Sequence, residues 1–169
     1  VLLGPEMKST GEVMGIDKTF GRAFAKSQLA TGIKLPKQGT TFISVKDSDK
    51  PKSVEIAKGL QDMGYQIVAT KGTADYLKLN GIDAELIKKV KDGSPHCVEA
   101  IESGRINIVI NTTFGEQAIE DSFSIRRSSL NKNLPYCTTI AGASALLGGL
   151  KSIKEEDLSI TTIQEYNNL

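Results

Sequence analysis

The sequence is poor in the residues that most often bind metals or build catalytic centres. Among its 169 residues His96 is the only histidine, and its two cysteines, Cys97 and Cys137, lie far apart. Clustered cysteine and histidine ligands for zinc are therefore missing, and one histidine cannot support a serine–histidine–aspartate set of its own. We expect no catalytic residue and no metal site in this chain, and we expect two reduced thiols.

The sequence also lacks long apolar runs and an excess of either charge. Its longest apolar stretch, residues 140–150, is broken by glycines and is shorter than the ~18 residues that a membrane helix needs. Lysine and arginine number 21 and aspartate and glutamate 20. The resulting net charge of +1 favours neither nucleic acid nor an anionic membrane as a partner.

The N-terminal part is irregular. The chain begins with valine and shows no signal-peptide pattern, so we expect a piece of a longer protein. Residues 1–17 are rich in glycine and predict loops, whereas residues 18–30 predict a helix with Phe20 and Phe24 on its apolar face. Residues 31–39 combine glycine, proline and lysine without a period, which indicates a linker and a domain boundary.

From residue 40 onward, strand patterns alternate with helix patterns. This alternation is typical of β–α–β units with right-handed crossovers, which build an open parallel sheet with helices on both faces. The expected strands are residues 40–45, 65–69, 83–87, 106–110 and 135–139, with a possible extended piece at 158–163. The expected helices cover about 51–63, 73–80, 95–103, 117–131 and 141–150.

Polar residues gather where the expected strands end. In an open parallel sheet, ligands bind beyond the carboxyl ends of the strands. The segments that follow the first, second, fourth and fifth strands are 46–50, 70–73, 111–113 and 138–139. They are rich in hydroxyls, amides and lysines, which donate hydrogen bonds, so this edge of the sheet suits an anion.

The segment Thr70–Thr73 is the sharpest element of that edge. Gly72 permits a close backbone approach, and Thr73 resembles the N-cap of the following helix. Free N–H groups and the positive dipole end at such a helix start form a cradle for phosphate, and Lys50 adds positive charge from another loop. On the residues alone, a phosphate site and a purely structural cap both remain open.

Other features favour structural interpretations. His96 follows Pro95 at an expected helix start and predicts a surface or capping histidine. Arg126 and Arg127 indicate a solvated helix face. The chain has neither a P-loop nor a G-x-G-x-x-G motif, and we expect no cofactor bound to it.

Several segments together resemble a known family. They are KSTGEVMG at 8–15, the strand FISV with its lysine loop, ATKGTA at 69–74, INTT at 110–113, AIEDSFSIRR at 118–127 and the YCTT turn. This combination, which covers nearly the whole chain, is similar to the C-terminal end of the carbamoyl-phosphate synthetase large subunit. The resemblance implies that residues 1–37 are the tail of an ATP-grasp synthetic domain plus a linker. Residues 38–169 are then implied to be a methylglyoxal-synthase-like allosteric domain with a five-stranded parallel sheet.

The resemblance also implies a function. Enzymes of this family make carbamoyl phosphate from bicarbonate, glutamine or ammonia, and ATP, for arginine and pyrimidine synthesis in the cytoplasm. ATP and Mg²⁺ or Mn²⁺ are expected in the rest of the large subunit, and a glutaminase small subunit is the expected partner. This part is implied to be regulatory, without catalysis of its own, and to contribute to an oligomer.

The family's site residues correspond to suitable side chains in this sequence. A nucleotide effector such as UMP or IMP is implied to bind through Lys50, Thr70, Thr73, Lys89, Asn111, Thr112, Thr113 and Asp121. Ornithine is a further implied ligand, at the domain interface, through Tyr136 and Thr138.

Other classes of protein remain as alternatives. Methylglyoxal synthase, a lyase that acts on dihydroxyacetone phosphate, shares the strand-end pattern but needs a Gly-Gly-Asp-Gln-Gln stretch, where this chain has NTTFGEQAIED. The cyclohydrolase domain of purine synthesis shares the S-V-x-D opening. A plain interaction module leaves the hydroxyl-rich edge unexplained. The segment at residues 8–15 favours the synthetase family over both enzymes.

Overall fold

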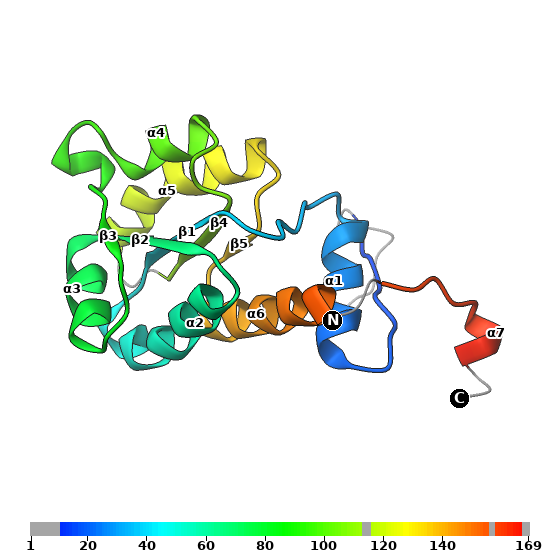
Figure 1. Ribbon diagram of the computed structural model, residues 1–169. Helices are drawn as coiled ribbons and strands as arrows, with labels where there is room; N and C mark the ends of the chain where they lie inside the picture. The colour runs from blue at the N-terminus through cyan, green and yellow to red at the C-terminus, as the bar shows by residue number, and fades with distance from the viewer. Residues whose placement is uncertain (1–10, 113–115, 156–157, 167–169) are drawn as a thin grey trace, which may run out of the picture.

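A five-stranded parallel sheet organises the chain from residue 40 onward (Figure 1). The computed structural model describes residues 11–112, 116–155 and 158–166. The strands are β1 (Thr40–Ser44), β2 (Gln66–Ala69), β3 (Glu85–Leu86), β4 (Ile108–Asn111) and β5 (Tyr136–Cys137), in the spatial order β3-β2-β1-β4-β5. All neighbouring pairs are parallel, which confirms the predicted α/β sheet and the approximate place of each strand.

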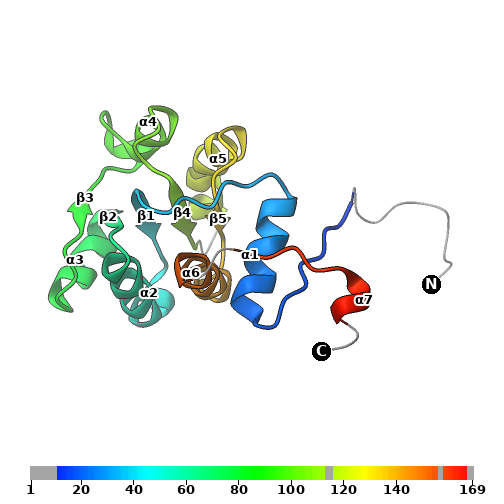
Figure 2. The same ribbon diagram turned by 45° about the vertical axis from the view of Figure 1, so that its right-hand side comes forward.

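Helices cover both faces of the sheet, as Figure 2 shows most clearly. The helices are α1 (Phe20–Ala30), α2 (Lys50–Asp62), α3 (Lys71–Leu79), α4 (Cys97–Glu102), α5 (Glu116–Asn131), α6 (Ile140–Glu155) and α7 (Ile163–Tyr166), with short 3-10 turns η1 (Asp47–Asp49) and η2 (Val90–Asp92). Helices α2, α3 and α6 contribute to the core on one face, and α4 and α5 to the core on the other. None of the helices described is long and apolar enough to cross a membrane.

The central strand β1 shows why the sheet is buried on both faces. Successive strand residues point to opposite faces. Ile43 accordingly lies in the core with α2, α3 and α6, whereas Phe42 lies in the core with α4 and α5, and both side chains are fully buried. The two apolar layers fix the positions of the loops at the ends of the strands.

Helix α1 crosses α6 at a point of close contact. A Cβ atom on Gly21 would lie 2.5 Å from Ser152 Oγ and 2.8 Å from the carbonyl oxygen of Gly148, so only glycine allows this approach. The predicted helical face is confirmed, since the rings of Phe20 and Phe24 lie 5.9 Å apart. Phe24 packs against the core, but Phe20 is 72% exposed because the contact with α6 runs through the small residues.

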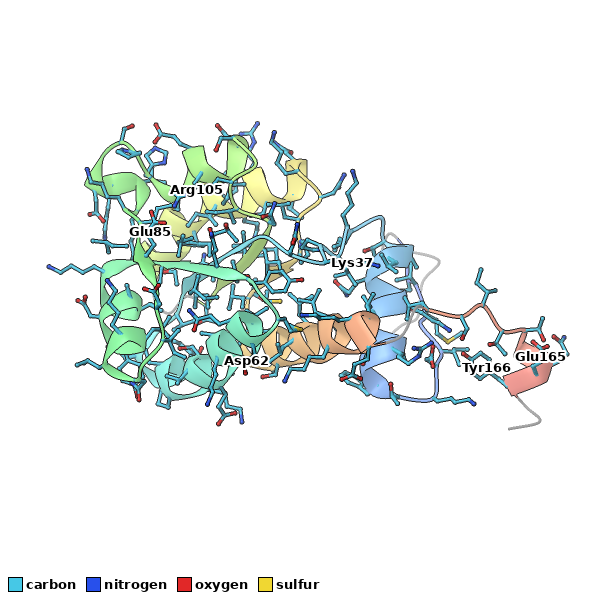
Figure 3. All side chains as sticks on the ribbon, in the orientation of Figure 1. Lys37, Asp62, Glu85, Arg105, Glu165 and Tyr166 are labelled. Atoms are coloured by element: carbon cyan, nitrogen blue, oxygen red, sulfur yellow. The ribbon has the colours of Figure 1, made fainter. Side chains whose placement is uncertain are left out.

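The C-terminal segment folds back onto the N-terminal part of the chain. The hydroxyl of Tyr166, labelled in Figure 3, donates to the carbonyl oxygen of Ile16 at 3.0 Å and accepts from Lys26 Nζ at 3.1 Å. Lys26 Nζ also lies 2.8 Å from a carboxylate oxygen of Asp17. The possible extended piece at 158–163 forms no strand over 158–162, and α7 begins at Ile163.

The boundaries of two helices decide how their first residues are interpreted. His96 is the N-cap of α4, where its Nδ1 accepts from the N–H of Glu99, so the capping prediction is confirmed. Helix α3 begins earlier than predicted. Its N-cap is Thr70, and Thr73 lies inside the first turn. The prediction of Thr73 as the N-cap is therefore wrong.

Candidate functional site

An open pocket of about 340 Å³ lies where β1 and β2 end. Its walls come from the end of β1, from η1 and the first residue of α2, from the start of α3 and from η2. The lining residues are Ser44, Val45, Asp47, Lys50, Thr70, Lys71, Gly72, Thr73, Lys89, Lys91 and Asp92. The pocket therefore occupies the carboxyl edge of the sheet, where ligands of open α/β folds bind.

Hydroxyl groups join the end of β1 to the start of α3. The hydroxyls of Ser44 and Thr70 lie 3.0 Å apart, and the N–H of Val45 donates to Thr73 Oγ1 at 3.2 Å. The Thr73 side chain is only 2% exposed. Its hydroxyl thus has a structural role between two elements, although a hydroxyl that accepts one bond can still donate its own proton.

The start of α3 faces into the pocket with its backbone. The first N–H groups of a helix have no partner inside the helix, and here these belong to Lys71 and Gly72. A Cβ atom on Gly72 would lie 3.6 Å from Lys50 Nζ, so the Lys50 ammonium group sits over the helix start. The backbone donors and this positive charge lie together, as a phosphate group requires.

Lys50 already forms an ion pair with an aspartate, but this ion pair is weak. Its Nζ lies 2.7 Å from Asp47 Oδ1, and the Asp47 side chain is 94% exposed. The hydrogen bond and the charge of Lys50 hold the pKa of the Asp47 carboxyl below its usual value. An ion pair in water contributes little, so an anionic ligand can take the place of Asp47 at small cost.

The pocket concentrates positive charge. Its lining holds four lysines against two aspartates, a net formal charge of +2, whereas the whole chain carries +1. One of these aspartates, Asp92, accepts from the N–H of Lys89 at 3.3 Å and so stabilises the turn that carries Lys89 and Lys91. The arrangement attracts anions to this edge of the sheet.

The structure brings together half of the nucleotide-site residues implied by the resemblance. Lys50, Thr70, Thr73 and Lys89 line the one pocket. Asn111 and Thr112 are buried at the end of β4 beside it but are not part of its lining. Thr112 Oγ1 accepts from the N–H of Lys46 at 3.1 Å, which ties β4 to the loop after β1. Thr113 and the side chain of Asp121 lie outside the described residues.

The two residues implied for ornithine lie one strand further along the edge. Tyr136 is half-buried on β5, and its hydroxyl accepts from Asn111 Nδ2 at 3.4 Å. The Arg126 guanidinium carbon lies 5.9 Å from the centre of the Tyr136 ring. Thr138 is exposed in the turn before α6. Tyr136 is thus in hydrogen-bond contact with a residue of the implied nucleotide set.

Five lining residues have no assigned role in the prediction from sequence, namely Ser44, Val45, Lys71, Lys91 and Asp92. Ser44 ends the first expected strand and was counted as part of it. Lys71 stands within the segment Thr70–Thr73 but was given no role. Lys91 follows the third expected strand, and the rule that ligands bind after strand ends, applied to that strand as well, would have found it.

Nothing in the described residues suggests a metal centre or a reactive thiol. No group of three or more histidine, cysteine, aspartate or glutamate side chains is placed to hold a metal ion there. Cys97 and Cys137 are unpaired. Burial raises the pKa of Cys97 to about 11 and that of Cys137 to about 12, so both thiols are protonated at neutral pH.

The fold and the sequence together define the class of protein. Residues 52–138 match the family of MGS-like domains, and because this stretch is more than half of the chain, the chain belongs to that family. Among solved structures it is similar to methylglyoxal synthase from Elizabethkingia anophelis NUHP1, with a TM-score of 0.55 and 16% identity over 81% of this chain and 93% of the other. That identity supports the shared fold alone.

Curated relatives are much more similar in sequence. The chain is 54% identical, over 98% of its length, to a carbamoyl phosphate synthase large chain from Myxococcus xanthus, of which it spans 15%. It is 47% identical to the C-terminal section of the corresponding large chain from Methanopyrus kandleri, of which it spans 31%. The resemblance noted in the sequence is confirmed, and the chain corresponds to a small part of these relatives.

Proposed function

We propose that this chain is the C-terminal regulatory part of a carbamoyl phosphate synthase large chain. Identity of 54% across 98% of the chain, rather than a shared fold, supports the assignment. The ligase reaction, with its ATP and Mg²⁺ or Mn²⁺, belongs in this proposal to the rest of the large chain, and glutamine hydrolysis to a small subunit. The two unpaired thiols agree with a cytoplasmic location.

The regulatory ligand in this proposal is a nucleotide bound through its phosphate. The observation that carries it is the single pocket in which Lys50, Thr70, Thr73 and Lys89 meet at the carboxyl edge. The phosphate lies over Gly72, accepts hydrogen bonds from the N–H groups at the start of α3, and pairs with Lys50. Nucleotides such as UMP and IMP share this phosphate.

The remaining implied residues fit a ligand that extends along the edge toward β4. In the proposal Lys89 and Asp121 contact the ribose or base. The segment Asn111–Thr113 begins at the last residue of β4, and the described part of it lies next to the pocket. Ornithine binds in this scheme near Tyr136 and Thr138, with its other contacts supplied by a neighbouring domain, because a buried cationic ligand needs carboxylates around it.

The N-terminal segment and α1 carry an apolar surface that suits contact with the rest of a large chain. Met14, Leu29 of α1 and Ile160 of the C-terminal segment are all exposed and line one open hollow. Large apolar side chains gathered on one surface mark an interface. We therefore assign residues 1–37 to the synthetic domain and its linker, and residues 38–169 to the regulatory domain.

Calorimetric titration of the 169-residue chain with UMP, IMP and inorganic phosphate tests the proposal. A hydrogen bond to a charged group contributes about 1.5–3 kcal/mol, so Lys50→Ala should weaken binding roughly tenfold to a hundredfold. Lys78→Ala is the matched control, because Lys78 is exposed in the last turn of α3 and does not line the pocket. Unchanged binding by a folded Lys50→Ala protein would show that the phosphate is not held there.

A lyase activity on dihydroxyacetone phosphate is the alternative to exclude, since methylglyoxal synthase shares the fold. We expect no methylglyoxal from this substrate. Methylglyoxal release that Asp121→Asn abolishes would replace the regulatory proposal with a catalytic one.

A further inference from the structure

One ammonium group joins the N-terminal and C-terminal parts of the described chain. Lys26 Nζ lies 2.8 Å from Asp17 Oδ2 and donates to the carbonyl oxygen of Ile16 at 3.2 Å. It also donates to the hydroxyl of Tyr166 at 3.1 Å, and this hydroxyl donates in turn to the Ile16 oxygen. A lysine ammonium has three protons, and these three acceptors use all of them. The four groups therefore form a closed network.

The C-terminal side of this network is held in shape by its own helix start. Helix α7 has only four residues, too few to be stable in water by themselves. The carboxylate of Glu165 accepts from the N–H of Thr162 at 2.8 Å, and Thr162 Oγ1 accepts from the N–H of Glu165 at 3.3 Å. This reciprocal capping box fixes one turn and with it the position from which Tyr166 reaches Lys26.

The network crosses the proposed boundary between the two domains. Ile16 and Lys26 lie in the part assigned to the synthetic domain, whereas Tyr166 lies in the part assigned to the regulatory domain. Figures 1 and 2 show α7 clear of the sheet and beyond α1, on the side of the molecule away from α3. The segment that leads into α7 lines the same open hollow as Met14. The C-terminal segment thus lies against the synthetic part and not on the sheet of its own domain.

A single helix connects this side of the molecule to the ligand-binding edge. Helix α6 begins directly after Thr139 at the carboxyl edge, and its 16 residues span about 24 Å and end beside α1. Lys50 of the pocket is the first residue of α2, and a Cβ atom on Gly59 of α2 would lie 2.8 Å from Leu147 Cδ2 of α6. Close-packed interiors transmit strain. A movement of Lys50 with its ligand therefore reaches α6, α1 and the C-terminal segment through direct contacts.

We propose that residues 158–166 form a strap by which the regulatory domain holds the end of the synthetic domain and signals the state of the effector pocket to it. Tyr166 and Lys26 are the positioning residues of this strap, and neither lines the pocket. Regulation requires a reversible contact, and a few hydrogen bonds at a partly exposed position can open locally while the domains stay folded. The inference rests on the proposed function, and it adds the segment through which the signal leaves the regulatory domain.

Amide hydrogen exchange in the 169-residue chain, followed residue by residue by NMR, tests whether Lys26 holds the strap. Lys26→Met removes the bonds of the ammonium group and should speed exchange of the hydrogen-bonded N–H groups in the α7 turn at least about threefold. Tyr166→Phe removes the contact from the other side, leaves Asp17 paired, and should act in the same way. Lys18→Met, at an exposed position before α1, is the matched control and should leave these rates unchanged. Unchanged exchange in both test variants would show that the network does not hold the strap.

The regulatory role is tested in the complete large chain assembled with its small subunit. Carbamoyl phosphate formation is measured with and without UMP and IMP. Tyr166→Phe should reduce the change of rate that the effector causes at least about threefold, because one of the contacts that pass on the signal is lost. The rate without effector, and the affinity of the substrate-free enzyme for effector, should stay within about twofold of the parent. Gln164→Ala, at an exposed position of the same turn, is the control and should change none of these quantities.

The outcomes separate the strap from the proposed function. If the Tyr166→Phe enzyme responds to UMP and IMP as the parent does, or if its rate falls equally with and without effector, the strap is wrong and the regulatory assignment stands. If the parent enzyme binds neither nucleotide, or binds them without a change of rate, the proposed function is wrong and the signalling role of the strap is wrong with it. A weaker response at unchanged affinity, together with faster exchange in α7, supports the inference.

Discussion

The two edges of the sheet are both polar, but their polar groups do different things. At the amino edge, Asn107 Oδ1 accepts from the N–H of Thr40 at 2.9 Å, and Lys154 Nζ donates to the carbonyl oxygen of Met63 at 3.0 Å. These side chains bond to backbone groups of neighbouring elements. At the carboxyl edge, hydroxyls bridge the loops, while the lysines line a pocket whose described lining includes two aspartates as counter-charges.

Pocket volume does not distinguish the two edges of the sheet. A second pocket, of about 320 Å³, lies at the amino edge under the linker that carries Lys37, which Figure 3 labels. The Tyr65 hydroxyl donates to the carbonyl oxygen of Pro36 at its wall, and the lining also holds Lys37, Lys154 and Glu155, a net formal charge of +1. The two pockets have similar volumes, and what distinguishes the carboxyl-edge pocket is its four lysines together with the N–H groups at the start of α3.

The comparison predicts that substitutions at the amino edge cost stability and leave binding unchanged. The largest effect is expected for Gly39→Ala. Gly39 has φ +144°, which disfavours a side chain, and its new Cβ would overlap Asn107 Oδ1. Strain and overpacking together should lower the free energy of unfolding by about 2–4 kcal/mol. Urea denaturation measures the loss, and phosphate titration of the folded protein should show no change.

Gly32→Ala is the matched control for this prediction. Gly32 also has positive φ, +81°, but its Cβ would meet nothing within 4 Å. It therefore reports the backbone strain without the clash. Equal losses at the two positions would mean that the contact between Gly39 and Asn107 adds nothing to the amino edge.

Thr73 lies at the carboxyl edge but makes a structural hydrogen bond, so its substitution should cost stability as substitutions at the amino edge do. Thr73→Val keeps the shape of the side chain but leaves the buried N–H of Val45 without its acceptor. An unsatisfied buried donor costs about 1–3 kcal/mol, so the melting temperature should fall clearly. Ser44→Ala should cost less, because Ser44 is only half-buried and its partner is another hydroxyl. A Thr73→Val protein as stable as Ser44→Ala would contradict the structural role of Thr73.

Thr73 also shows which features could not be predicted from the sequence. The strands, most helices and the carboxyl-edge location were predictable, because strand composition, helix period and the strand-end rule are local or general features. The role of Thr73 was not, because its partner is the N–H of Val45, 28 residues earlier in the chain. Local sequence contains a possible cap but not the tertiary contact that uses the hydroxyl instead.

Two features near the chain ends were not predictable for the same reason. The exposure of Phe20 follows from the contact of α1 with α6 through glycines, and this crossing is visible only in three dimensions. Residues 158–163 were predicted to be extended, whereas the segment leads into α7, whose Tyr166 bonds to Lys26 and Ile16. Local pattern was sufficient for elements inside the sheet and insufficient where chain ends pack against each other.

A lysine at the amino edge should contribute to stability. Lys154→Met keeps the length of the side chain and removes the hydrogen bond to the Met63 carbonyl oxygen, which ties the end of α6 to the end of α2. The bond is partly exposed, so we expect a loss of about 1 kcal/mol in urea denaturation. Lys151→Met, at an exposed position on the same helix, is the control and should stay within about 0.5 kcal/mol of the parent. If the Lys154→Met and Lys151→Met proteins are equally stable, the hydrogen bond of Lys154 does not stabilise this edge.

The smallest expected effect is a gain in stability, whereas the earlier substitutions are expected to lower it. Lys71→Gln should raise stability by about 0.3–1 kcal/mol at low ionic strength, because it removes a cation from the positive end of the α3 dipole while glutamine and lysine have similar helix propensities. Lys78→Gln, in the last turn of the same helix, removes a cation from the negative end and should lower stability by a similar amount. Thermal unfolding in low and high salt measures both differences, and both should shrink with salt because exposed charges are screened.

If Lys71→Gln lowers stability instead, Lys71 has a structural partner, and its position at the helix start no longer indicates an anionic ligand. A gain in stability together with weaker phosphate binding would show that the carboxyl edge keeps a destabilising charge for its ligand, in contrast to Lys154, whose hydrogen bond stabilises the amino edge.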